Sequence, residues 1–92
     1  SIVGVAAAVR MDGGKIAEAR IGLTNVGGAP ERATAVEEAL VGATSMAEIE
    51  AAANLASDGI EPFADEDADV EFRKHLARVM TKRAVARAAN IS

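Results

Sequence analysis

A pair of glycines between two alternating segments is the feature that most narrows what this chain can fold into. Residues 2–11 carry an apolar side chain at every second position, and residues 15–25 repeat that alternation. A period of two predicts β-strands that bury one face. The intervening Asp-Gly-Gly-Lys of residues 12–15 is a hairpin signal. The sequence therefore predicts an antiparallel pair of strands.

The register of this hairpin decides the predicted length of its loop. A loop of the two glycines alone would set Val9 opposite Glu18 and bring a charge onto the apolar face. A three-residue loop, 12–14, sets Val9 opposite Ala17 instead. Because a slip of one residue moves every side chain to the other face, we expect the three-residue loop. Gly14 should then adopt the left-handed conformation of a bulge position.

Two short helices are predicted to follow the hairpin. Pro30 is placed to open the first, over residues 31–41, and Gly42 is placed to end it. Residues 45–48, Ser-Met-Ala-Glu, match a capping box that starts the second helix, which should end at Gly59. The positions predicted to be buried on these helices are Ala33, Val36, Leu40, Ile49, Ala52, Ala53 and Ala56.

A third, longer helix is predicted after an acidic loop at residues 60–68. Asp69 serves as its expected N-cap, and the helix should run to about Asn90. Its basic residues run toward the C-terminal end, which suits the helix dipole. We expect Leu76 and Val79 to pack on the sheet face that carries Val5, Ala7, Ile21 and Leu23. The full stripe predicted to be buried is Phe72, Leu76, Val79 and Met80.

These elements predict an α+β fold in one domain that spans residues 1–92. A two-stranded hairpin is too little sheet to be stable by itself. Either the helices cover one face, or a further strand completes the sheet, or both. The fold class is accordingly a small antiparallel sheet, with a possible third strand, packed against three helices.

Composition excludes several classes of function. The chain has no cysteine, so disulfides, thiolate zinc sites and iron–sulfur ligation are excluded, and a cytoplasmic origin is expected. No apolar run approaches the roughly 18 residues of a membrane span. The apolar start lacks an initiating Met and a basic leader, which suggests a trimmed fragment. With Phe63 and Phe72 as its only aromatic residues, the chain offers little stacking surface for single-stranded nucleic acid.

Charge is unevenly distributed along the chain. Residues 31–71 hold twelve acids and one base, whereas residues 72–92 hold six bases and no acid. Such asymmetry can mark an interaction surface. The basic residues surround the third helix and face an acidic remainder, so a solvated or partner-facing helix is favoured over a nucleic-acid contact.

Alternating acids at residues 65–71 resemble the first half of a calcium loop. That loop requires Gly at its sixth position and Glu at its twelfth, and this chain has Val70 and Leu76 there. A solvated loop that leads into a helix is the favoured interpretation. The four acids are Asp65, Asp67, Asp69 and Glu71.

Two other candidates for chemistry are weak. His75, the only histidine, has no Ser or Cys nucleophile with an orienting acid at a catalytic spacing. Residues 28–30, Gly-Ala-Pro, run into a predicted helix start, where an anion could bind. The sequence therefore assigns no catalytic, cofactor-binding or metal-binding residue.

Several segments, in their order and spacing, resemble one known family. Residues 16–26 resemble the second strand of the C-terminal domain of carbon monoxide dehydrogenase medium subunits. A Pro, an Arg-Ala pair and a helix ending in Leu-x-Gly follow there, and the last helix carries an aromatic-Arg pair, a Leu and a basic run. Phe72 departs from the Tyr that is usual in the family. The matching residues here are Pro30, Arg32-Ala33, Leu40-Val41-Gly42, Asp69, Phe72-Arg73, Leu76 and Lys82-Arg83-Ala84.

The resemblance implies a C-terminal structural and docking domain in the FAD subunit of a molybdenum hydroxylase. In that family a preceding domain holds most FAD contacts, and the flavin receives electrons from iron–sulfur clusters and a molybdenum-cofactor subunit. The isolated chain is then expected to carry no cofactor, to bind FAD no better than about millimolar, and to be non-catalytic. Any flavin contact within this chain is expected near Thr24, Asn25 and Gly28. The alternatives are a free-standing protein-interaction module and a small-molecule site at residues 28–30.

Overall fold

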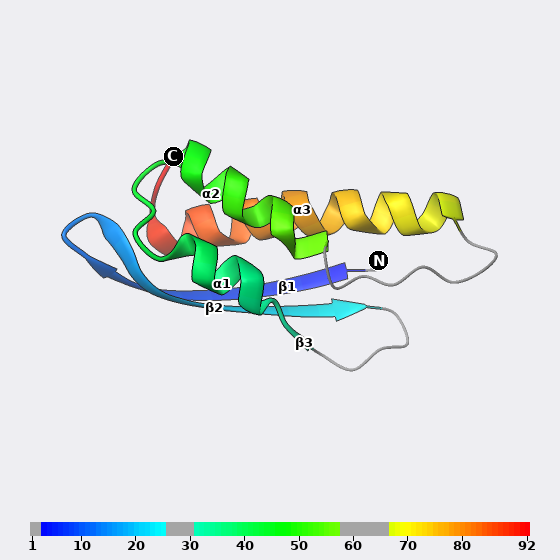
Figure 1. The fold of residues 1–92 in the computed structure, drawn as a ribbon, viewed down its shortest axis with the longest axis horizontal. Helices are drawn as coiled ribbons and strands as arrows, with labels where there is room; N and C mark the ends of the chain where they lie inside the picture. Colours follow the sequence, from blue (N-terminus) through cyan, green and yellow to red (C-terminus); the bar gives the residue numbers. More distant parts are fainter. Residues whose placement is uncertain (1–2, 26–30, 58–66) are drawn as a thin grey trace.

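A hairpin with a short third strand forms one layer of the structure, and the helices form the other (Figure 1). The computed structural model describes residues 3–25, 31–57 and 67–92. The strands pair antiparallel in the order β1-β2-β3, and the helices lie on one side of the hairpin. This arrangement confirms the predicted α+β class. The elements are β1 (Val3–Asp12), β2 (Lys15–Asn25), β3 (Glu31–Arg32), α1 (Thr34–Leu40), α2 (Met46–Ala53), the 3-10 turn η1 (Asn54–Ser57) and α3 (Asp67–Ala89).

The hairpin turn contains two residues, so the predicted three-residue loop is wrong. Asp12 pairs with Lys15, and the loop consists of Gly13 and Gly14. Their φ angles are 61° and 83°, which is the left-handed pair that a type I′ turn requires. The expected positive φ of Gly14 is confirmed.

A β-bulge restores the alternation that this turn would otherwise reverse. The register shifts between Arg10 and Met11, so that Met11 pairs with Ile16 and Arg10 with Glu18. Ala17 is the extra residue. Val9 consequently lies opposite Ala19, not opposite Ala17 as predicted. The apolar side chains still share one face, as predicted. The bulge keeps them there, and the length of the loop does not.

The start of the first helix differs from its prediction. Residues 31 and 32 form β3, in which Arg32 pairs with Gly22, and α1 begins only at Thr34. The backbone N–H of Ala33 donates to the Ile21 carbonyl over 2.8 Å. Because β2 has an open edge here, an extended segment satisfies its backbone groups better than an earlier helix would. Pro30 lies outside the described residues.

The same edge of β2 is paired further along by the turn that follows α1. Gly42 has φ 91°, as expected for the stop of a helix. Its N–H donates to the Ile16 carbonyl over 2.7 Å, and the Ile16 N–H donates to the Ala43 carbonyl over 3.0 Å. The turn between α1 and α2 thus continues the edge pairing that β3 begins.

The capping box of α2 is present. Ser45 Oγ accepts from the Glu48 N–H over 3.3 Å. The Glu48 carboxylate in turn accepts from the backbone N–H and the hydroxyl of Thr44, each over 2.9 Å. The Thr44 hydrogen bonds hold the pKa of Glu48 below its ordinary value. Gly59, the predicted end of this helix, lies outside the described residues. All seven positions predicted to be buried on the first two helices join the core or pack against it.

The third helix begins at Asp67, two residues before the predicted N-cap at Asp69. Its predicted end near Asn90 is confirmed. Asn90 has φ 56°, its N–H donates to the Arg87 carbonyl, and the Ile91 N–H donates to the Ala86 carbonyl. These two bonds form the Schellman pattern that closes a helix.

The face that α3 buries is not the predicted one. Phe72 is 55% exposed, and the other three residues of the predicted stripe are only half-buried. Apart from Arg73, the residues that the helix buries have small or medium-sized side chains, which allow the close approach of α3 to β1. Apolar residues occur on every side of α3, so the sequence pattern of this helix does not identify which face is buried. The buried positions are Arg73, Ala77, Thr81, Val85 and Ala89.

Candidate functional site

The acids and the histidine singled out in the sequence do not converge on one site. His75 and Glu71 are exposed on α3. Asp67 and Asp69 lie in the first turns of that helix, and Asp65 lies outside the described residues. Within residues 3–25, 31–57 and 67–92, no cluster of three potential metal-ligating side chains occurs. The calcium hypothesis receives no support from this part of the chain.

The helix start suggested as an anion site, residues 28–30, lies outside the described residues, so it stays a prediction. Thr24, at the end of β2, is exposed. Its hydroxyl reaches across the hairpin toward the Gly4 carbonyl at 3.5 Å. This contact joins the ends of the first two strands.

The basic residues of α3 are divided between internal and external contacts. Arg78 donates to Ser57 Oγ over 3.1 Å, and Lys82 pairs with Glu50 over 3.1 Å. These contacts fasten α3 to the segment comprising α2 and η1. Arg83 and Arg87 are exposed. The basic helix therefore serves the domain's own packing in part, while Arg83 and Arg87 face water.

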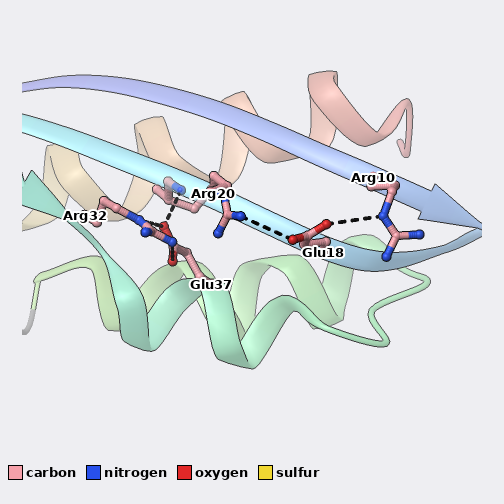
Figure 2. Close-up of polar contacts among 6 residues, drawn as sticks. Arg10, Glu18, Arg20, Arg32 and Glu37 are labelled. Carbon is pink, nitrogen blue, oxygen red and sulfur yellow. Dashed lines mark hydrogen bonds and ion pairs between the residues drawn. The ribbon is translucent and has the colours of Figure 1, made fainter.

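Glu37 on α1 is a buried carboxylate that accepts three hydrogen bonds from two other elements (Figure 2). The Ile21 N–H donates to Glu37 Oε2 over 2.8 Å, and the Arg32 guanidinium donates to both carboxylate oxygens over 3.1 and 2.7 Å. Glu37 is buried, whereas the Arg32 side chain is 55% exposed. The Arg32 hydrogen bonds hold the pKa of Glu37 below its ordinary value, against the opposing effect of burial. This carboxylate completes the edge of β2 where β3 ends.

A row of charges crosses the sheet on the face that the helices leave uncovered (Figure 2). Glu18 on β2 pairs with Arg10 over 3.2 Å and with Arg20 over 3.3 Å. Both guanidinium groups are well exposed, at 65% and 61%. Exposed pairs of this kind contribute little to stability. Their position on an open face makes them available to a binding partner.

Two shallow hollows lie on this uncovered face. One, of about 280 Å³, is lined by side chains of all three strands, and the other, of about 210 Å³, lies over β1 and β2. They meet at Ala8 and Arg20. Neither reaches the roughly 300–1,000 Å³ of an enclosed small-molecule site. A shallow, open surface of this kind suits contact with a protein.

The sequence reading missed both Glu37 and the uncovered face. Glu37 could not be found because its partners come from two other elements. The face did carry a signal, since the outward positions of β1 are Gly4, Ala6 and Ala8. Outward positions of a solvated strand are ordinarily polar.

Comparison with known proteins shows a consistent set of relatives. The sequence model described as CO dehydrogenase flavoprotein C-terminal domain matches residues 1–88. The carbon monoxide dehydrogenase medium chain of Afipia carboxidovorans is 39% identical over 84 residues, which cover 90% of this chain and 29% of that protein.

Solved structures agree in fold. Quinoline 2-oxidoreductase from Pseudomonas putida 86 superposes with a TM-score of 0.83 at 34% identity, over 96% of this chain and 31% of that one. Carbon monoxide dehydrogenase from Hydrogenophaga pseudoflava gives 0.80 at 37% identity, over 94% and 30%. The chain thus spans about a third of the length of these relatives. No helix in the described ranges is long and apolar enough to cross a membrane.

Proposed function

This chain belongs to the family of CO dehydrogenase flavoprotein C-terminal domains, and from that premise we propose that it is the C-terminal structural and docking domain of an FAD-carrying subunit. The main support for the proposal is the share of each protein that the match covers. The family match runs over residues 1–88, yet the chain fills only about a third of its relatives. A domain that matches along its whole length, but forms a minor part of its relatives, acts within a larger protein.

The parent protein in this proposal is an oxidoreductase of the molybdenum hydroxylase type. The Hydrogenophaga relative is described as lacking the Mo-pyranopterin moiety of its molybdenum cofactor, so a molybdenum cofactor belongs to that enzyme. By this kinship the parent subunit passes electrons from iron–sulfur clusters to FAD. The partners are the flavin-binding domain of the same subunit and the iron–sulfur and molybdenum-cofactor subunits, in the cytoplasm.

The domain's own contribution is structural. In this proposal residues 1–92 are one domain, in which Glu37 joins α1 to β2 and Lys82 joins α3 to α2. Chemistry at the flavin belongs to the cofactor, which a larger domain binds. We assign no catalytic, cofactor-binding or metal-binding residue to this chain.

A flavin titration tests whether FAD is bound by the larger domain and not by this chain. FAD is added to the purified 92-residue chain and to the complete subunit, and binding is followed by flavin fluorescence and calorimetry. We expect the isolated chain to bind more weakly than about 1 mM, and the complete subunit to purify with FAD. Stoichiometric binding by the isolated chain at micromolar concentration would contradict the proposal. So would a reading frame that starts at β1 with no flavin-binding segment before it.

A further inference from the structure

The uncovered face of the sheet has an unusual set of side chains for a surface in water. We call it the open face. Facing cross-strand pairs on it include Ala6 with Gly22 and Ala8 with Arg20. The helices pack on the opposite side, which carries Val5 and Ile21. The open face consists of Gly4, Ala6, Ala8, Arg10, Glu18, Arg20, Gly22, Thr24 and Arg32.

The centre of the open face is flat and apolar. Ala6 and Ala8 are exposed, and Gly22 across the pair has no side chain. The two shallow hollows join at Ala8, so the floor is continuous along the hairpin. One face of an antiparallel sheet can remain in water, but it then usually carries polar side chains. Methyl groups and a glycine backbone at the centre of the open face instead allow another protein surface to approach the sheet closely.

The rim of the open face is basic, although the domain is acidic. Arg10, Arg20 and Arg32 are each more than half exposed, and Glu18 is the one acid among the nine residues of the face. Arg32 also pairs with Glu37 of α1, so the excess positive charge comes from Arg10 and Arg20. The whole chain has a net charge of −4. Positive charge is therefore concentrated here against the overall balance. A complementary partner presents carboxylates around an apolar centre.

We propose that the open face is the surface on which the flavin-binding remainder of the subunit docks, through an apolar patch flanked by carboxylates. The occupant follows from the extent of the relatives, since a chain covering 31% of the quinoline enzyme's subunit leaves roughly 70% of it elsewhere. A domain joined to so large a remainder needs a contact surface with it. The proposal rests on the proposed function and adds the side of the domain that makes the contact.

Arginine labelling tests the proposal without any substitution. The 92-residue chain and the complete subunit are treated with phenylglyoxal, and modification is quantified at each arginine by mass spectrometry. We expect Arg10 and Arg20 to be protected roughly tenfold in the complete subunit, because each guanidinium would pair there with a carboxylate of the docked surface. Arg83 and Arg87, exposed on α3, are internal controls and should react equally in both samples.

Equal labelling of Arg10 and Arg20 in both samples would overturn the docking surface. If that complete subunit still carries FAD, the proposed function stands and only this inference fails. If no larger flavoprotein contains the chain, both fail. Protection of the two arginines that rises with the concentration of the isolated chain would identify a second copy as the occupant, and would also overturn the proposal.

A matched pair of substitutions provides a second readout. Ala8→Gln places a longer neutral side chain on the floor, and Ala51→Gln makes the same change at an exposed position of α2. In the complete subunit, Ala8→Gln should raise labelling of Arg20 at least several-fold toward that of the isolated chain, and Ala51→Gln should not. Both variants of the 92-residue chain should keep the wild-type circular dichroism spectrum and melting midpoint. Unchanged Arg20 protection in Ala8→Gln, with the fold intact, would contradict the proposal.

Discussion

Glu37 offers the sharpest test of how the sheet and the first helix are joined. Replacing it with Ala leaves the N–H of Ile21 without its acceptor at a fully buried residue. A buried donor that loses its partner costs about 1–3 kcal/mol. The pair with Arg32 is left out of this figure, because that side chain is 55% exposed and water screens the pair. We therefore expect Glu37→Ala to lower the free energy of unfolding by about 1–3 kcal/mol.

The pH dependence supplies a second, independent readout. The pKa of Glu37 is lowered in the folded protein from an ordinary 4.5, chiefly by the Arg32 hydrogen bond. A carboxyl with a lowered folded pKa stabilises the protein above its unfolded pKa and loses that contribution as the pH falls through the folded value. Glu37→Gln mimics the protonated acid. Its deficit relative to wild type should be full at neutral pH and shrink below pH 4.5.

Urea unfolding followed by circular dichroism measures both effects, since the chain has no Trp or Tyr to report by fluorescence. Glu38, the adjacent exposed acid on α1, provides the control variant Glu38→Gln, which should leave stability nearly unchanged. A loss under about 0.5 kcal/mol for Glu37→Ala, at an unchanged denaturant slope, would refute the reasoning. A Glu37→Gln deficit that is the same at neutral and acid pH would refute the electrostatic part of it.

Four further substitutions test local features by the same urea assay. Gly14→Val should destabilise by about 1–2 kcal/mol, because φ is 83° there and the added side chain meets no neighbour; a neutral result would contradict the type I′ turn. Ser45→Ala should cost about 0.5–2 kcal/mol through loss of the cap on α2, and no loss would mean that the Glu48 N–H finds another acceptor. Val85→Ala should cost about 1–3 kcal/mol, because Val85 is fully buried. Leu76 is only half-buried, so Leu76→Ala should cost less. A larger loss for Leu76→Ala would support the face of α3 that the sequence predicted.

The sequence predicted the elements whose signals are local. Strict alternation located both long strands, and Ser45 with Glu48 located the start of α2, because each signal acts within a few residues of chain. It failed where tertiary contacts decide. β3 is two residues long and has no period to detect. The buried side of α3 was misassigned because large apolar residues were preferred, whereas the sheet selects small ones such as Ala77 and Val85.

The surface proposed for docking falls between these two cases. The alternation predicted the covered side correctly, since Val5, Ala7 and Ile21 do lie in the core or against it. It did not predict a use for the other side, although the outward positions of β1 were visible as small residues.

The bulge at Ala17 has a consequence for how this hairpin can change in length. Ile16 and Ala19 lie three positions apart, yet both face the helices. They do so because Ala17 is the bulge residue and has no partner on β1. A sequence with that one residue deleted would form an uninterrupted two-residue hairpin, with Met11 still opposite Ile16 and Val9 still opposite Ala19. The deletion would move no side chain between the covered and the open face. One position in the hairpin can thus be lost or gained, while a single insertion or deletion in the ladder further along would exchange the core for the surface.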